Sequence, residues 1–101
     1  MCGNIQMQNI KMDIQLDKIF RKQYKKAHEN IQTAFKERVR LFSENQHHVL
    51  LHNHLLTGKY RGHRSINITG DWRAIYIERE TTDKKIHIKF KLFGTHSQLY
   101  R

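Results

Sequence analysis

The dominant spacing of apolar residues differs between the two halves of this chain, with a helical period in the first half and a period of two in the second. Between Lys18 and Ser43 the apolar side chains recur every three or four residues, which is typical of helices with one buried face. The second half holds three segments in which apolar and polar residues alternate, as in strands with one buried side. A chain with this switch has to pack helices against one face of a sheet, which predicts an α+β fold.

The same two periods predict the order of the elements. MDIQLD alternates ahead of the helical region and indicates a first, short strand. The helical region is too long for one helix in a small domain, so we place a break near HENIQ, where Asn30 can cap a second helix. The strands RSINI, WRAIYIER and IHIKFKLF follow, separated by the turns TGD and TTDKK. We expect a β-α-α-β-β-β order, in which a small antiparallel sheet carries an N-terminal helical hairpin on one face and is polar and basic on the other.

Alternation in the last strand predicts which side chains share a face. One face is expected to hold Ile86, Ile88, Phe90 and Leu92, and the other His87, Lys89, Lys91 and Phe93.

The length of 101 residues, 38% of them hydrophobic, suffices for one domain with one modest core. We therefore treat residues 1–101 as a single domain and expect residues 1–11 to form a flexible N-terminal extension. Cys2 is the single cysteine, so no disulfide can form within the chain, which is typical of a reducing compartment. The opening segment lacks the apolar run of a signal peptide, and no segment has the roughly 20 apolar residues of a membrane span. These features predict a cytoplasmic protein with no membrane partner.

The charge balance points to a polyanionic partner. Nineteen Lys and Arg residues against nine Asp and Glu residues give a net charge of +10 with neutral histidines. Nucleic acid is the first candidate for such a partner, an acidic protein segment the second and an anionic membrane surface the third. On the first helix, the lysines at 22, 25 and 26 either meet a nucleic-acid backbone or are simply solvated.

Residues 50–101 carry short motifs in a fixed order. HLLTGKY places a histidine before an L-x-G-x-Y element, GHRSINI begins a strand with G-x-R, GDW follows a tight turn, and GTHSQLY lies near the end of the chain. This set resembles the toxins of bacterial type II toxin–antitoxin modules of the RelE/ParE superfamily, closest to the YafQ-like branch. The first half resembles them in topology only.

The resemblance implies a RelE-like fold and a ribosome-dependent endoribonuclease activity. Such an enzyme cuts mRNA in the ribosomal A site without a metal or another cofactor, and a cognate acidic antitoxin neutralises it. Whether toxin and antitoxin assemble into a higher-order complex is left open.

Metal-free RNA cleavage uses the 2′-hydroxyl of the RNA as nucleophile, so the protein has to supply a base, an acid and positive charge. Histidine suits both proton steps because its ordinary pKa lies near neutrality, and arginine and lysine stabilise the charge on the phosphate. The resemblance gives the catalytic roles to His54, Asp71 and His96 and leaves open which histidine is the base. The expected RNA contacts are Lys59, Arg61, Arg64, Asn67, Arg73 and Tyr100.

Several of these residues have alternative interpretations. Some YafQ-like toxins carry a further histidine where this chain has Asn67, and asparagine can hydrogen-bond but cannot exchange a proton near neutral pH. Arg64 lies two residues before Ile66 and so on the same face of the strand, and the alternative to phosphate binding is that it stabilises the sheet. Trp72 fits core packing better than base stacking, whereas Tyr100 fits a stacking platform and a hydrophobic plug equally.

The other histidines before the first motif, at positions 47, 48 and 52, are expected to be solvated or to face RNA. His48 and His52 would lie one turn apart on a helix, as zinc ligands do, but Glu44 is the only carboxylate nearby and no cysteine is close. We therefore predict no metal site.

Two other functions remain as alternatives, a ParE-like inhibitor of DNA gyrase and an inactive module that only binds its antitoxin. His54, Asp71 and His96 favour the nuclease, because a gyrase inhibitor needs no acid–base set. The tail from His96 onward is expected to add little to the core and, if helical, to place His96 and Tyr100 on one face.

Overall fold

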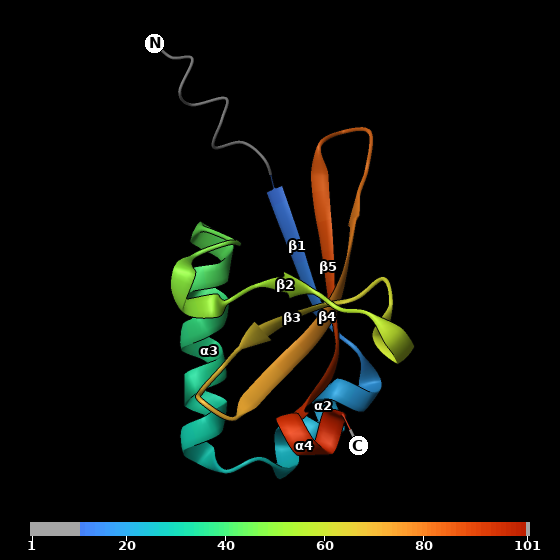
Figure 1. Ribbon diagram of the computed structural model, residues 1–101. Coiled ribbons are helices and arrows are strands. Elements are labelled where there is room, and N and C mark those ends of the chain that lie inside the picture. Colours follow the sequence, from blue (N-terminus) through green and yellow to red (C-terminus); the bar gives the residue numbers. More distant parts are fainter. Residues whose placement is uncertain (1–10, 101) are drawn as a thin grey trace.

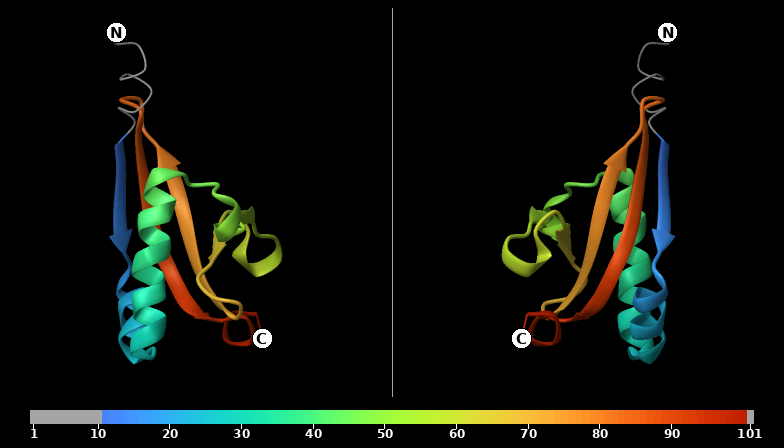
Figure 2. Two further views of the ribbon diagram at one scale, coloured as in Figure 1. Left: turned by 90° about the vertical axis from the view of Figure 1, so that its left-hand side faces the viewer. Right: turned by 90° about the vertical axis from the view of Figure 1, so that its right-hand side faces the viewer.

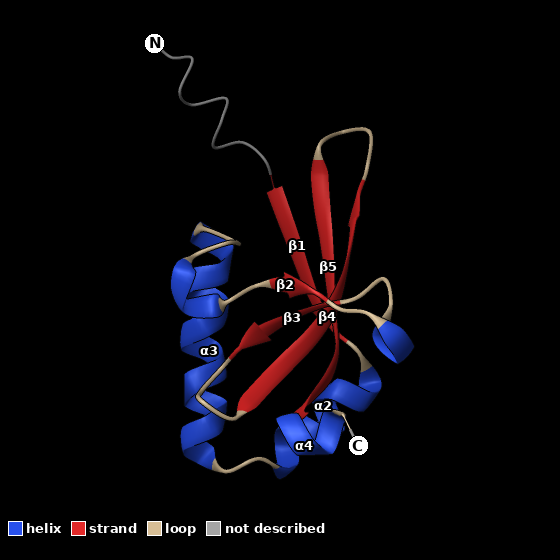
Figure 3. Ribbon diagram, viewed as in Figure 1, coloured by secondary structure: helices blue, strands red, loops and turns tan. Residues whose placement is uncertain are grey.

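The computed structural model of the protein describes residues 11–100. Its centre is a five-stranded sheet with the order β1-β5-β4-β3-β2 (Figures 1 and 3). The strands span Lys11–Leu16 (β1), His54–Leu55 (β2), Arg64–Asn67 (β3), Trp72–Glu80 (β4) and Lys85–Thr95 (β5). Neighbouring strands from β2 to β5 are antiparallel, whereas β1 runs parallel to β5. The α+β class and the predicted order are confirmed, with the short β2 and a C-terminal helix added, but the sheet is mixed and not antiparallel throughout.

The parallel pairing of β1 has a simple physical reason. Strands joined by a tight turn have to be antiparallel, but β1 and β5 are distant in the sequence, so their relative direction is free. In the observed register Ile14 lies opposite Ile88, and Leu16 lies opposite Phe90. Parallel pairing thus keeps the apolar side chains of both strands on one face of the sheet.

Two helices cover that face (Figure 2), and a short third helix ends the described chain. Tyr24 and Gln32 tie the first two together, since the Gln32 side-chain amide donates to the Tyr24 carbonyl at 2.9 Å. His28 occupies the N-cap of the second helix. The predicted cap, Asn30, is therefore wrong, because this residue lies within the helix, where its Oδ1 is 2.8 Å from His28 Nδ1. The helices span Lys18–Lys26 (α2), Glu29–Glu44 (α3) and His96–Leu99 (α4), and 3-10 turns occur at Val49–Leu51 (η1) and Gly58–Tyr60 (η2).

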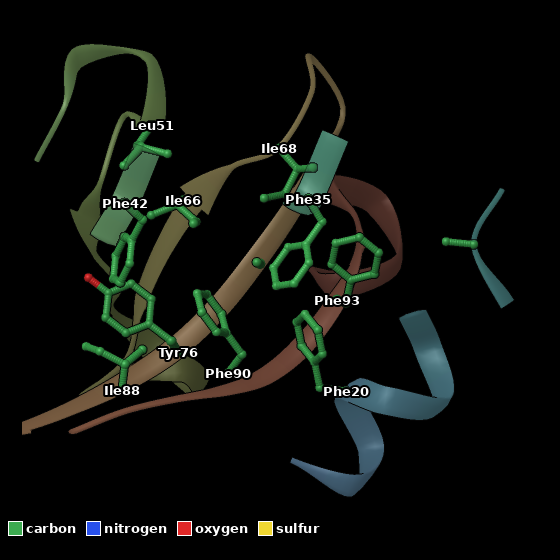
Figure 4. Close-up of a cluster of buried hydrophobic side chains, with 12 residues drawn as sticks. Phe20, Phe35, Phe42, Leu51, Ile66, Ile68, Tyr76, Ile88, Phe90 and Phe93 are labelled. Atoms are coloured by element: carbon green, nitrogen blue, oxygen red, sulfur yellow. The ribbon is translucent and has the colours of Figure 1, made fainter. Parts of the chain in front are cut away.

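Aromatic rings fill the space between these helices and the sheet (Figure 4). The Phe20 ring lies 5.2 Å from that of Phe35 and 5.6 Å from that of Phe90, so α2, α3 and β5 meet there. Burial of one such side chain stabilises the fold by about 1.5–3 kcal/mol. The buried members of this main core are Phe20, Ala27, Phe35, Phe42, Leu51, Ile66, Ile68, Ala74, Tyr76, Ile88, Phe90 and Phe93.

A bulge in β5 reverses the side-chain alternation near the end of the strand. The pairing between β4 and β5 skips Lys91, so β5 carries one extra residue there. Phe93 therefore joins the main core, while Leu92 packs beside Ile75 in a different cluster. The predicted faces of Leu92 and Phe93 are wrong, because one additional residue moves every following side chain to the other face.

The face away from the helices holds a second, smaller apolar cluster in place of the wholly polar surface expected. Leu56, Ile75 and Leu99 are buried there, with Tyr60 and Leu92 packed against them. The segment after β2 and α4 stand on this face, opposite α3 (Figure 2). Leu99 is only 3% exposed, so the expectation that the tail adds little to the core is wrong.

The predicted N-terminal extension lies outside the described residues, except for Lys11, which begins β1. Within residues 11–100 no helix combines the length and apolar character that crossing a membrane requires.

Candidate functional site

A cleft of about 450 Å³ lies between β2, β3, β4 and the C-terminal end of the described chain. It joins side chains that are far apart in the sequence. Its polar lining consists of His52, His54, Thr57, Ser65, Asn67, Arg73, His96 and Tyr100.

The backbone orients the His54 imidazole. After η1 the chain turns at His52, which has a left-handed conformation with φ 46° and ψ 48°. The His54 Nδ1 lies 3.0 Å from the His52 carbonyl oxygen, and the two imidazole centroids are 5.1 Å apart. Because a carbonyl only accepts hydrogen bonds, Nδ1 has to carry the hydrogen. In the neutral ring Nε2 then holds the lone pair, so His54 is suited to accept a proton.

His96 and Tyr100 come from the single helical turn predicted for the tail. Their ring centroids are 4.7 Å apart with an interplanar angle of 37°. A capping box forms this turn: the Thr95 hydroxyl accepts from the Gln98 amide at 3.2 Å, and the Gln98 side chain accepts from the Thr95 amide at 2.9 Å. Local hydrogen bonds therefore bring the second histidine to the cleft.

Tyr100 combines both of the roles considered for it. Its ring packs edge-on against Tyr60 at 5.4 Å, yet 36% of the residue is exposed and it lines the cleft. Burial raises the pKa of the Tyr100 hydroxyl, and the neighbouring Ser65 and Arg73 offset only part of this increase. Tyr100 thus lines the cleft as a neutral side chain whose ring is accessible on one side.

Two buried oxygens belong to residues that line the cleft. Ser65 is fully buried, and in the described part of the chain neither its Oγ nor Asn67 Oδ1 has a hydrogen-bond partner of ordinary geometry. An unpaired buried polar atom costs about 1–3 kcal/mol. These buried oxygens therefore lie beside the cleft without a partner of ordinary geometry.

Arg73 brings positive charge to the cleft. Its Nη1 donates to the carbonyls of Thr69 at 3.1 Å, Gly70 at 3.2 Å and Trp72 at 3.1 Å. These contacts hold the guanidinium over the β3–β4 turn.

Asp71 lies in the same turn but does not line the cleft. Its side chain is exposed, and its backbone carbonyl accepts a hydrogen bond from the His96 amide at 3.0 Å. Trp72 packs against Phe93 at 5.2 Å, at the edge of the main core, so the preference for core packing is confirmed.

Three of the predicted RNA contacts lie outside the cleft. Arg64 faces the helix side of the sheet, where its Nε donates to Asn53 Oδ1 at 2.8 Å, which matches the alternative of bracing the fold. The Lys59 Nζ lies 5.1 Å from the ring centroid of Tyr60. Arg61 is the exposed C-cap residue that follows η2.

The structure thus brings together His54, His96, Asn67, Arg73 and Tyr100. Sequence reasoning gave no specific role to His52 or Ser65. A strand-like segment places residues i and i+2 on one face, so the spacing from His54 was the available signal for His52.

His48 has a local structural role instead of the zinc-ligand role considered for it. Its Nδ1 accepts from the Leu50 amide at 3.1 Å and caps η1. Between residues 11 and 100 no three His, Cys, Asp or Glu side chains converge as metal ligands.

A larger groove, of about 940 Å³, lies at the opposite edge of the sheet. We call it the basic groove; its cationic lining consists of Lys18, Arg21, Lys22, Lys25 and Lys89. No histidine lines it, so it can attract anions but has no group that exchanges protons near neutral pH. The histidine-lined cleft is therefore the candidate catalytic site.

Comparisons with known proteins agree with this fold. Residues 12–101 match a family described as the bacterial toxin of type II toxin–antitoxin system, YafQ. The crystal structure of YafQ from E. coli BL21(DE3) is 25% identical in sequence, with 90% of this chain and 100% of that chain covered and a TM-score of 0.70. A chain in the E. coli DinJ-YafQ toxin–antitoxin complex is 27% identical, with coverages of 91% and 100% and a TM-score of 0.69.

A YoeB/ParE toxin from Agrobacterium tumefaciens has the same fold at 15% identity, with 84% of this chain and 99% of that chain covered and a TM-score of 0.68. None of the curated proteins compared with the chain matches it. Because the family match spans nearly the whole sequence, the chain belongs to the YafQ family of toxins of bacterial type II toxin–antitoxin systems.

Proposed function

We propose that the protein is an endoribonuclease that cleaves mRNA in the ribosomal A site. The observation that carries this proposal is the cleft, which gathers His54, Arg73 and His96 from three separate segments. Two groups that exchange protons near neutral pH and one permanent positive charge are what RNA cleavage by its own 2′-hydroxyl requires.

In the proposed reaction His54 is the general base. Its Nε2 takes the proton from the 2′-hydroxyl, whose oxygen attacks the adjacent phosphorus, while the Nδ1 hydrogen bond to the His52 carbonyl keeps the ring oriented. Arg73 stabilises the charge that builds on the phosphate oxygens. His96, in its protonated form, donates a proton to the 5′-oxygen as the phosphorus–oxygen bond breaks. The products are a 2′,3′-cyclic phosphate and a 5′-hydroxyl end.

Other cleft residues hold the substrate in this proposal. Asn67 and Ser65 offer oxygens to hydrogen-bond donors of a nucleotide, and the exposed side of Tyr100 stacks on a base. Asp71 has an orienting role in this proposal, because its backbone carbonyl accepts a hydrogen bond from the His96 amide at the start of α4.

The partner that silences the toxin is proposed to be a cognate acidic antitoxin. The DinJ-YafQ complex joins one relative to its antitoxin. A net charge of +10 complements an acidic segment and speeds its association. Since the ribosome is the site of action, the toxin works in the cytoplasm.

Mapping of mRNA 5′ ends after induced expression tests this function, beside a DNA gyrase supercoiling assay on the purified protein. We expect new 5′ ends inside translated reading frames, their loss when the start codon is removed, and full cleavage in EDTA. Intact mRNA with inhibited supercoiling would instead identify a gyrase inhibitor. Intact mRNA with normal supercoiling would identify an inactive antitoxin-binding module.

A further inference from the structure

A hydrogen-bond network ties the segment before β2 to the main core. Tyr76 is fully buried, and its hydroxyl lies at the edge of the cluster of apolar side chains (Figure 4). Asn53 Nδ2 donates to this hydroxyl at 2.7 Å and to the Gln46 carbonyl at 3.0 Å. On the other side of the amide, Arg64 Nε donates to Asn53 Oδ1 at 2.8 Å. Asn53 is thus anchored to β3, to β4 and to the loop after α3.

These partners fix the orientation of the Asn53 amide. A carbonyl can only accept and a guanidinium can only donate, so the nitrogen has to face Gln46 and the oxygen has to face Arg64. The Gln46 side chain adds a second donor to the Tyr76 hydroxyl at 3.1 Å and also donates to Glu78. Rotation of the amide would break contacts on both sides at once.

The position of Asn53 between two cleft histidines gives this network a consequence for the site. With Asn53 directed toward the main core, His52 and His54 both reach the cleft. His52 keeps a left-handed backbone conformation, which is unfavourable for a residue with a side chain. Such a conformation persists only where surrounding contacts hold it. Its carbonyl is the group that accepts from His54 Nδ1.

We propose that Asn53 is a positioning residue for His54. Through Tyr76 and Arg64 it holds the His52 carbonyl at the one place where that carbonyl keeps the hydrogen on His54 Nδ1 and the lone pair on Nε2. This inference rests on the proposed function, in which His54 Nε2 is the general base.

Two variants test this role. Tyr76→Phe removes one hydroxyl and keeps the ring in the core, while Asn53→Ala removes the whole anchor. Tyr24→Phe is the matched control, because its hydroxyl donates to the Gln32 carbonyl at 3.3 Å between α2 and α3, away from the cleft. Thermal unfolding establishes that each variant is folded.

¹⁵N NMR of the imidazole rings identifies the tautomer of His54 at a pH about two units above the ordinary histidine pKa. The His54 signals are assigned by comparison with His54→Gln. We expect the Nδ1–H form in the unaltered protein and a shift toward Nε2–H in Asn53→Ala and Tyr76→Phe. Single-turnover cleavage should fall about tenfold in both, with RNA binding unchanged, and Tyr24→Phe should match the unaltered protein in every measurement.

The two proposals fail in distinguishable ways. An unaltered protein that cleaves no RNA would end the proposed function, yet the His54 tautomer would still report on Asn53. If the tautomer is the same in the unaltered protein, Asn53→Ala and Tyr76→Phe, the positioning role is overturned, whatever happens to cleavage.

Discussion

His54 and His96 both line the cleft, and each is hydrogen-bonded to a different backbone carbonyl. The His52 carbonyl accepts from the side chain of His54, and the Asp71 carbonyl accepts from the amide of His96. Both residues are otherwise exposed, so replacing either side chain removes its imidazole without creating a cavity in the core.

Replacement of either histidine by alanine is therefore expected to reduce cleavage without unfolding. Single-turnover rates for His54→Ala and His96→Ala should fall roughly 10²–10⁴-fold, the usual contribution of one proton-transfer group. His47→Ala is the control, since His47 is exposed and does not line the cleft. An equal loss at His47 would argue for a general effect on folding and against this acid–base pair.

Tyr76 makes the stability of the protein sensitive to high pH. Burial raises the pKa of its hydroxyl above the ordinary value near 10, against the opposing hydrogen bonds from Gln46 and Asn53. Above about pH 10 the unfolded chain has released this proton while the folded chain retains it, so unfolding releases protons. The free energy of unfolding therefore falls as the pH rises through this range, and the contribution is lost above the folded pKa.

Urea unfolding at about pH 9 and about pH 11 measures this slope. In Tyr76→Phe the decrease in stability between the two pH values should be smaller than in the unaltered protein, because phenylalanine has no proton to release. Equal decreases in both proteins would show that other groups cause the alkaline loss.

At the scale of elements, α4 is the part of the fold most dependent on its surroundings. A helix of four residues is far too short to be stable by itself. Burial of Leu99, the capping box of Thr95 and Gln98, and the hydrogen bond from Tyr60 to the Leu99 carbonyl hold it in place. Two cleft residues, His96 and Tyr100, depend on this short element.

Loss of the cap should therefore affect stability and activity together. Thr95→Ala is expected to lower the free energy of unfolding by about 1 kcal/mol and to slow cleavage, because α4 then frays. Denaturant unfolding and single-turnover cleavage check the two effects, with Ser97→Ala, an exposed change on the same helix, as the control. A normal cleavage rate in a destabilised Thr95→Ala would mean that the order of α4 is not needed for chemistry.

At the scale of the whole molecule, the basic groove and the histidine-lined cleft occupy opposite edges of the sheet. The basic groove lies along β1 and α2, and the cleft lies at β2, β3 and β4. In the proposed function, the basic groove attracts a polyanion and the cleft acts on a single phosphodiester.

Ribosome binding is accordingly expected to weaken steeply with salt, because phosphate contacts release counterions. Lys22→Glu and Lys25→Glu, in the basic groove, should weaken binding and reduce the salt dependence while leaving the single-turnover rate at saturation unchanged. Lys36→Glu, an exposed position of α3 that does not line the groove, makes the same change of charge elsewhere. Equal weakening by all three would show that only net charge matters, and salt-insensitive binding would contradict an RNA partner.

Much of the site was accessible from motifs. His54, Asn67, Arg73, His96 and Tyr100 were identified in the sequence, and they line one cleft. Each of them lies in a turn, a strand or a capped helical end, whose geometry depends on a few neighbouring residues.

Residues whose place depends on distant partners were harder to assign. Arg64 donates to Asn53 on the other side of the sheet, and His52 lines the cleft beside residues of β3, β4 and α4. Leu99 is buried because it packs with residues of the segment after β2, of β4 and of β5, namely Leu56, Tyr60, Ile75 and Leu92.

The sequence by itself determined the α+β class and the order of the main elements, and the family resemblance of its motifs singled out His54 and His96. Periodicity and short motifs carry this information because they express local geometry. The tertiary structure alone decided the parallel direction of β1, the bulge at Lys91 and the orientation of the His54 ring. The first two result from pairing between strands distant in the sequence, and the third depends on the left-handed turn at His52; none of them leaves a repeating pattern along the chain.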